Sequence, residues 1–267
     1  MRSFVTIVSG IFLLGLNLAG QSFGSLKVNS IALSVTKDNR NPSDLSIKEI
    51  RDLYYAAASA PDEIINGRKY TRYYFGGKTT PLLFSGLAFR ASLDFNGRQC
   101  ENVRLQYDTY LDQVVYTDTS RLIDLQYPMI SLNHDLVRGF SFSYNNESYN
   151  FRYVKFTGNS KDILPDGFYE IAYDGPTELL IRHRSVQYVK EAVTEYDYSP
   201  ESYIFLGGSF SRITNKEKDF IRMFGQQSEA VKEYLRKNRI RYRKAGKDEV
   251  AGVLKYYDSI NQLKKPE

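Results

Sequence analysis

The segment from Asn66 to about residue 210 alternates apolar and polar positions with a period of two. Such alternation predicts β-strands with one buried side, and the Tyr-, Phe- and Val-rich runs have strand length. Residue pairs that accept the positive φ angles of tight hairpins recur at Asn66–Gly67, Gly76–Gly77, Asn96–Gly97, Asn145–Asn146 and Asp174–Gly175. The pattern therefore predicts an antiparallel meander, twisted sheet or sandwich of about eight to ten strands.

Residues 140–153 read FSFSYNNESYNFRY, with three aromatic residues at alternate positions on each side of a polar break. A four-residue loop at Asn145–Ser148 would place all six rings on one side of a hairpin, in the pairs Tyr144 with Tyr149, Phe142 with Phe151, and Phe140 with Tyr153. In water so wide an apolar face would aggregate, so a second layer or a partner must cover most of it. We expect the rings in the core, with an exposed recognition surface as the alternative.

Helical periodicity flanks the alternating segment on both sides. Residues 46–60 place apolar side chains on one helical face, between Ser46 as N-cap and Pro61 as stop. Three short helices are expected near the C-terminal end, the first opened by a capping box at Thr214–Glu217 and the third capped by Asp248. This order predicts an α+β protein, predominantly antiparallel β, with a short N-terminal helix and a C-terminal cluster of about three short helices.

The first 24 residues have the order of a secretory signal peptide, with one arginine, an apolar run from Phe4 to Ala19, and then small residues. Cleavage is expected after Gly24, with the bond between Gly20 and Gln21 as an alternative. An uncleaved anchor helix is the competing interpretation, but the run is shorter than the roughly 20 residues that span a bilayer. The mature chain is expected to be exported, and periplasmic or associated with the outer membrane.

Four regions are predicted: a signal peptide at 1–24, an N-terminal segment with the amphipathic helix at 25–62, an antiparallel β domain at 63–211, and a basic helical region packed on that domain at 212–267. The single cysteine, Cys100, rules out an internal disulfide and is expected to be a buried apolar group. It lies out of phase with the strand that follows, which predicts a β-bulge near Glu101–Asn102.

The net charge of +5 lies entirely at the C-terminal end, where 15 Lys and Arg face 8 Asp and Glu from Ser211 onward. The densest run is VKEYLRKNRIRYRKAGK at residues 231–247. This patch could bind an acidic partner or anionic lipid, and export argues against nucleic acid. The candidate binding residues in it are Arg236, Arg239, Arg241 and Arg243. The alternative is a solvated helix face without a partner.

Motifs for catalysis are missing from the sequence. His183 lies between two arginines, whose charges oppose its protonation, and His134 has only sequence neighbours as possible partners. Asp108 and Asp112 form a near pair of carboxylates, expected to face water at a strand end or turn. No nucleophile elbow, phosphate-binding glycine loop, zinc spacing or calcium loop occurs. We therefore predict no catalytic residue, no metal and no cofactor, and a protein that is not an enzyme.

Tyrosine is abundant, with 22 residues, and tryptophan is absent. In YTRYYFGG, Tyr73 and Tyr74 are consecutive and must point to opposite faces of any strand, so at least one ring should be exposed. Exposed tyrosines suit recognition because the ring is apolar and the hydroxyl is polar. Both are candidate binding residues. The alternative is that tyrosine suits half-buried strands.

Four stretches taken in order resemble a group of uncharacterised exported envelope proteins of Bacteroidota, which are β-rich with a short helical tail: NGRKYTRYYFGGKTTPLLF, LDFNGRQCENVRLQYDTY, GFYEIAYDG, and VKEYLRKNRIRYRK with VAGVLKYYDSI. The resemblance spans about residues 64–263 and implies no functional residue. Asp258–Ser259–Ile260 resembles the O-glycosylation acceptor of such bacteria, although it falls in a predicted helix.

Together these patterns predict a non-enzymatic binding or scaffold component of the cell envelope. Its expected partner is an envelope protein or an outer-membrane component, with no nucleic acid and no integral membrane segment. The alternative is a glycan-binding module or a glycan-active hydrolase that uses exposed tyrosines and paired carboxylates.

Overall fold

The computed structural model describes Ile64 and residues 67–73, 77–120, 122–123, 125–155 and 164–262. Its strands are β1 (Arg68–Lys69), β2 (Phe89–Phe95), β3 (Arg98–Asp108), β4 (Gln113–Thr117), β5 (Met129–Ser131), β6 (Val137–Tyr144), β7 (Glu147–Val154), β8 (Gly167–Asp174), β9 (Glu178–Arg182), β10 (Ser185–Lys190), β11 (Val193–Tyr198), β12 (Glu201–Leu206) and β13 (Ser209–Arg212). Its helical elements are α5 (Leu83–Gly86), η2 (His134–Leu136), α6 (Glu217–Arg222), η3 (Gly225–Gln227), α7 (Ser228–Lys237), η4 (Tyr242–Lys244) and α8 (Lys247–Gln262).

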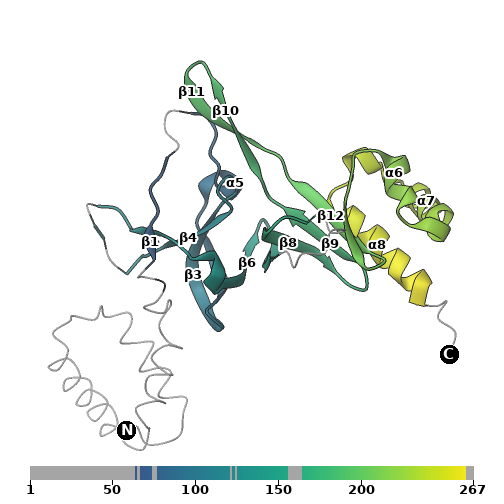
Figure 1. Cartoon of the computed structure of the whole chain (residues 1–267), viewed down its shortest axis with the longest axis horizontal. Helices are drawn as coiled ribbons and strands as arrows, with labels where there is room; N and C mark the ends of the chain where they lie inside the picture. Colours follow the sequence, from purple (N-terminus) through teal and green to yellow (C-terminus); the bar gives the residue numbers. More distant parts are fainter. Residues whose placement is uncertain are drawn as a thin grey trace, which may run out of the picture.

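Eleven strands form one antiparallel sheet in the order β1-β5-β4-β3-β2-β6-β7-β8-β9-β12-β13, and β10 and β11 form a separate two-stranded sheet. The β10–β11 hairpin stands away from the large sheet, and helices α6, α7 and α8 gather beside β9 and β12 (Figure 1). The predicted class, mainly antiparallel β with C-terminal helices, is confirmed. The predicted number of eight to ten strands is too small, because strands as short as β1 and β5 carry no readable alternation.

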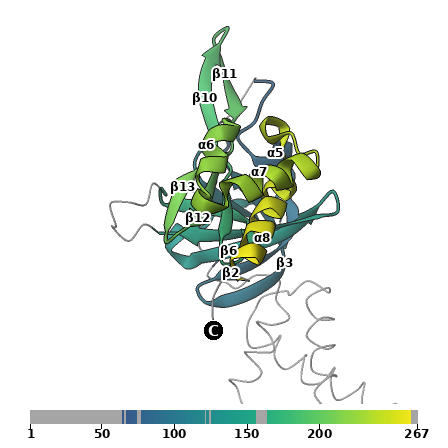
Figure 2. The same cartoon turned by 90° about the vertical axis from the view of Figure 1, so that its right-hand side faces the viewer.

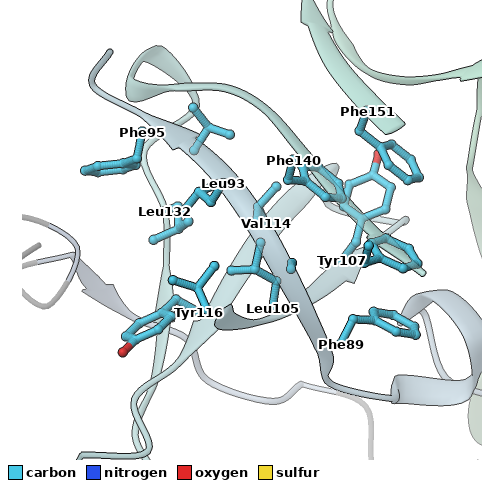
Figure 3. Packing of buried hydrophobic residues seen from close by; sticks show 14 of the residues in the cluster. Phe89, Leu93, Phe95, Leu105, Tyr107, Val114, Tyr116, Leu132, Phe140 and Phe151 are labelled. Atoms are coloured by element: carbon cyan, nitrogen blue, oxygen red, sulfur yellow. The ribbon is translucent and has the colours of Figure 1, made fainter. Parts of the chain in front are cut away.

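The first part of the large sheet curls around an aromatic core. Tyr107 on β3 lies 6.1 Å from Phe168 on β8, measured between ring centroids, although three strands separate β3 from β8 in the sheet. Tyr107 also contacts Phe140 and Phe151 across this space (Figure 3). Because the sheet curls, strands on opposite sides of the curl pack their aromatic side chains against each other. The inner face of the sheet therefore acts as its own second layer.

The hairpin at residues 140–153 pairs in a different register from the predicted one. Its loop has two residues, Asn145 and Asn146, with φ angles of 50° and 64°, so Phe142 pairs with Tyr149 and Phe140 with Phe151. Two consecutive asparagines accept the positive φ angles of a tight turn whose twist matches the strands. The predicted four-residue loop is therefore wrong. The rings still share one side: Phe140 and Phe151 stack at 4.4 Å and are each 4 % exposed, so the core interpretation is confirmed.

The predicted bulge is confirmed. Ala91 pairs with Val103 and Leu93 pairs with Cys100, so Glu101 and Asn102 together oppose a single residue of β2. The extra residue turns Cys100 back into the core, where it is 6 % exposed.

The C-terminal helices pack on β9 and β12 in a second hydrophobic core (Figure 2). Leu179 and Ile204 point from the sheet towards Val253 and Leu254 of α8, and all four side chains are at most 1 % exposed. Because neighbouring residues of a strand face opposite sides, Leu180 and Tyr203 contribute to a third cluster on the other face. Strands β9 and β12 are thus covered on both sides.

Helix starts differ from the predicted capping pattern. Lys216, not Thr214, is the N-cap of α6, and no side chain caps that helix. Helix α8 begins at Lys247, one residue before Asp248, and the Glu249 carboxylate accepts a hydrogen bond of 2.9 Å from the Gly246 N–H. Both predicted N-caps are wrong. Several polar residues lie near each helix start, and their capping propensities alone do not decide which one takes the N-cap position.

Asp258 in the predicted acceptor motif is 5 % exposed and lies within α8. Its carboxylate accepts hydrogen bonds from the Tyr173 hydroxyl at 2.9 Å and from the Thr177 hydroxyl at 2.9 Å. Burial and this carboxylate raise the pKa of Tyr173 to about 12. Asp258 thus fastens α8 to the β8–β9 turn.

Several predictions concern residues outside the described ranges: the signal peptide at 1–24, the helix at 46–60, Asn66, Gly76 and Tyr74. Within the described ranges, no helix combines the length and apolar character needed to cross a bilayer.

Candidate binding arm and the polar network at its base

The β10–β11 hairpin, called the arm below (185–198), is the outer part of one long hairpin. Its inner part is the pair β9–β12, in which Arg182 faces Glu201, and the arm continues in the same register with Ser185 facing Tyr198. The ladder is interrupted between them at Pro200, which has no N–H to donate. The arm therefore extends the large sheet but turns away from it beyond this break (Figures 1 and 2).

The outer part of the arm exposes apolar side chains. Val186 is 49 % exposed, Tyr188 is 44 % exposed and Val189 is 70 % exposed. These three residues are consecutive or nearly so, and the strand alternation puts Val186 and Tyr188 on one face and Val189 on the other. Isolated apolar residues on a surface are common, but here they lie on both faces of one hairpin.

At its base the arm is anchored by a tyrosine cluster. The Tyr196 ring of β11 is 4 % exposed and lies 6.1 Å from the Tyr73 ring and 5.6 Å from the Tyr110 ring. The Tyr73 hydroxyl donates a hydrogen bond of 2.6 Å to the Asp108 carboxylate, which also accepts one from Tyr70 at 2.7 Å. Burial and Asp108 raise the pKa of Tyr73 far above its usual range. Tyr73, predicted as a binding residue, is thus half-buried in this cluster.

The carboxylates of Asp108 and Asp112 do not form the water-exposed pair predicted for them. Asp108 is 0 % exposed, and its second oxygen accepts the backbone N–H groups of Tyr110 and Leu111. Asp112 instead accepts the Tyr107 hydroxyl at 2.5 Å and lies 3.6 Å from the Arg182 guanidinium. The β3–β4 turn turns each side chain towards its own buried partners, so the pair does not frame a cleft.

Two further contacts hold the arm at its base. The Ser185 N–H donates to the Thr109 carbonyl at 3.1 Å, and the two hydroxyl oxygens of these residues lie 2.6 Å apart. Glu195 of β11 accepts the Thr79 hydroxyl at 2.6 Å and the N–H groups of Lys78 and Thr79. These hydrogen bonds lower the pKa of Glu195. The segment before α5 therefore covers the outer edge of β11.

A buried chain of polar groups links the arm to α8. His183 Nδ1 lies 2.5 Å from the Tyr198 hydroxyl, and its Nε2 lies 2.7 Å from one oxygen of Glu170 on β8. The other Glu170 oxygen accepts a hydrogen bond of 2.9 Å from Lys247, the first residue of α8. Lys247 also pairs with Glu147 at 3.0 Å and lies 3.8 Å from the Tyr149 ring centroid. One cation thus joins two strands of the sheet to the helix.

Within this polar network, neighbouring groups stabilise the charged form of Glu170. Burial opposes ionisation of Glu170, but hydrogen bonds from His183 and Lys247 outweigh it and lower the pKa of Glu170. The carboxylate is therefore the acceptor, and the His183 Nε2–H donates to it. Burial also raises the pKa of Tyr198, which keeps its hydroxyl protonated as a donor.

The sequence-based view of His183 needs correction, because its two neighbouring arginines point elsewhere. Arg182 lies 3.6 Å from Asp112, and Arg184 lies 3.8 Å from Glu201. Alternation along the chain directs their side chains away from the histidine ring, which is 5 % exposed and faces Glu170. His183 is thus an internal member of a carboxylate network.

A pocket of about 300 Å³ lies beside this network. Phe84, Leu179, Pro200 and Val250 line it together with the polar chain described above. Both ring nitrogens of His183 and both oxygens of Glu170 already have partners, so the network is internally satisfied. Tyr198, whose hydroxyl contacts His183, also lines this pocket.

The four predicted basic residues are all exposed: Arg236 at the end of α7, Arg239 and Arg241 in the loop that follows, and Arg243 in η4. Arg236 lies 3.9 Å from Glu233, and both side chains are mostly in solvent, so this pair contributes little. Lys247, from the same basic run, is instead half-buried in the polar network.

The polar network was missed at the sequence level. Glu170 lies within GFYEIAYD at a strand position where both neighbours, Tyr169 and Ile171, are largely apolar, and this is the one local sign that it is buried. The partners Lys247 and Glu147 are 77 and 23 residues away in the chain, so no local pattern joins them.

Among the described residues no group of three or more His, Cys, Asp or Glu side chains could bind a metal ion. In comparisons with known proteins, no family model matches the chain, and no curated protein and no solved structure is detectably similar to it.

Proposed function

We propose that this protein is an exported, non-enzymatic binding component of the cell envelope, and that the arm contacts its partner, an envelope protein. The observation that carries the proposal is the contrast within the arm, whose base is anchored by buried polar contacts while Val189 near its tip is 70 % exposed. A rigid base limits the conformational entropy that binding costs, and exposed apolar side chains supply area to bury.

Site-specific photocrosslinking in intact cells tests this proposal. A photoreactive phenylalanine analogue at Val189 should give a discrete adduct with a protein, and the same analogue at exposed Lys232 on α7 should not. The adduct should disappear when Val186→Thr and Tyr188→Ser are added. Equal labelling from both positions, or an adduct that survives these substitutions, would contradict the proposal. Cell fractionation of the tagged full chain tests export separately.

Glycan binding or hydrolysis is a second candidate function, favoured by the Tyr198 hydroxyl that His183 and Glu170 support beside the pocket. A panel of labelled oligosaccharides, tested by binding and by cleavage, addresses it. Activity lost in Tyr198→Phe and in His183→Gln, with the fold retained, would favour this candidate. Binding or cleavage that both variants leave unchanged would assign it to another site.

A further inference from the structure

We infer that the free edge of β10 binds an extended segment of a partner protein by strand addition, with an acidic residue of that segment opposite Lys190. This inference rests on the proposed function and names how the arm would bind. In strand addition, backbone hydrogen bonds supply affinity, and alternate side chains supply specificity.

The hydrogen-bonding polarity of the arm identifies which backbone groups face outward. The Ser199 N–H donates to the Arg184 carbonyl, so even-numbered residues of β10 exchange hydrogen bonds with β11. The odd-numbered residues must then point away from β11. Ser185 fits this pattern, since its N–H donates to Thr109 outside the arm. Gln187 and Val189 therefore direct their N–H and C=O groups towards the free edge.

This edge is open along the outer half of β10. Within the described part of the chain, the backbone groups of Gln187 and Val189 have no hydrogen-bond partner, and every residue from Val186 to Lys190 is exposed. The matching edge of β11 differs, because the Tyr196 N–H donates to the Thr79 hydroxyl at 2.6 Å. One edge of the arm is covered by the segment before α5, and the other is unpaired among the residues that the structure describes.

Side chains beside the edge define the partner's chemistry. Natural edge strands are usually protected by a charged residue such as lysine, by proline or by a bulge, and of these β10, with the sequence SVQYVK, has only Lys190 at its outer end. An added strand would place its side chains next to Val186 and Tyr188 on one face and opposite Lys190 at the end. Apolar residues at alternate positions and a carboxylate at one end therefore complement this edge.

A second copy of the chain complements the edge less well. Antiparallel pairing of two arms through Gln187 and Val189 permits three registers, in which Lys190 lies opposite Arg184, Val186 or Tyr188 of the other copy. No register places a carboxylate opposite Lys190. In the first of them Lys190 faces Arg184, so two cations lie opposite each other. A heterologous acidic segment is thus the better occupant.

The test uses the mature full-length protein and the synthetic peptide acetyl-Glu-Thr-Val-Thr-Val-amide, with a Lys-for-Glu peptide as control. Binding is followed by amide chemical shifts and by hydrogen exchange. In the free protein the amides of Gln187 and Val189 should exchange fast and that of Tyr188 slowly. The acidic peptide should slow amide exchange at Gln187 and Val189. It should bind about fivefold more tightly than its control, because the control replaces one exposed charge attraction by a repulsion.

Two variants at one position separate backbone from side-chain binding. Val189→Pro removes an outward N–H without removing any hydrogen bond to β11. It should lower the affinity for the acidic peptide at least about tenfold. Val189→Thr keeps the N–H and should change affinity less than about threefold. Slow exchange of Tyr188 in both variants shows that the arm is intact. Lys190→Glu should reverse the preference between the two peptides.

The outcomes distinguish the inference from the proposed function. Equal affinity of Val189→Pro and Val189→Thr, or fast exchange of Gln187 and Val189 in saturated complex, would overturn strand addition. If crosslinking from Val189 still depends on Val186 and Tyr188, the arm then binds through a face. Concentration-dependent dimerisation abolished by Val189→Pro, without peptide binding, would identify a second copy as the occupant and overturn the inference.

Discussion

The β6–β7 and β10–β11 hairpins share a local design and differ in surroundings. Each is closed by a two-residue turn with positive φ at both positions, Asn145–Asn146 in one and Glu191–Ala192 in the other. Each alternates apolar residues with polar ones. Yet the rings of Phe140 and Phe151 are buried, whereas Val189 is 70 % exposed.

The difference lies in the neighbouring strands. β6 pairs with β2, and β7 pairs with β8, so the first hairpin is inside a curled sheet on both edges. Among the described strands the arm pairs only with itself, and Val186, Tyr188 and Val189 on β10 stay exposed although Tyr196 on β11 is buried against Tyr73 and Tyr110. Apolar alternation therefore identifies a strand but does not show whether the strand belongs to the core or to an interface.

The largest expected effect separates the two hairpins by stability. Phe140→Ala should lower the free energy of unfolding by about 3–5 kcal/mol, because it leaves a cavity among stacked rings. Val189→Ala should change it by less than about 0.5 kcal/mol, because this side chain is already in solvent. Urea denaturation measures both. Similar losses from the two substitutions would show that the arm is buried in solution.

A second effect concerns the network at the arm's base. Glu170→Gln removes a carboxylate that is 2 % exposed and leaves Lys247 without its buried partner, so the free energy of unfolding should fall by about 3 kcal/mol. Because the folded pKa of Glu170 is lowered below its ordinary 4.5, its stabilisation is complete above that pH and is lost as pH falls through the folded pKa.

Chemical denaturation of wild type and Glu170→Gln between pH 7 and pH 3 measures this acid dependence. The loss of stability below pH 4.5 should be smaller in the variant. Parallel acid profiles would show that Glu170 does not contribute to it. Lys232→Met on α7, whose ion pair with Glu229 is exposed, is a suitable control and should have little effect at any pH.

The smallest expected effect concerns the two turns. Ala192 has a φ of 62°, a backbone conformation that is strained for a residue with a Cβ atom. Asparagine tolerates this conformation better than alanine does. Ala192→Gly should stabilise the arm locally by about 1 kcal/mol, measured as slower amide exchange of Tyr188. Asn146→Gly should have less effect on the β6–β7 hairpin. Equal effects would show that Ala192 is not strained.

Local patterns in the sequence predicted more of the fold than of the site. The alternation, the Asn96–Gly97 turn and the bulge beside Cys100 depend on adjacent residues, and the structure confirms them. The predicted register of the β6–β7 hairpin is wrong, because the loop has two residues rather than the four predicted. The cap at Thr214 failed because Lys216 adopts that position.

The candidate site was harder to predict, since its members are far apart in the chain. Tyr73 looked like an exposed recognition residue, yet Asp108 and Tyr196 enclose it. Lys247 looked like one of a run of surface cations, yet its position at the start of α8 brings it to Glu170. No single stretch of sequence contains these pairs.

Adjacent residues were enough to indicate most strands, the Asn96–Gly97 turn and the C-terminal helices, because backbone preferences and side-chain alternation act over a few positions. Which apolar face is buried, which edge stays unpaired and which charges meet depended on the curl of the sheet and the docking of α8. These arise from contacts between residues distant in the chain, where burial and desolvation act and local propensity does not.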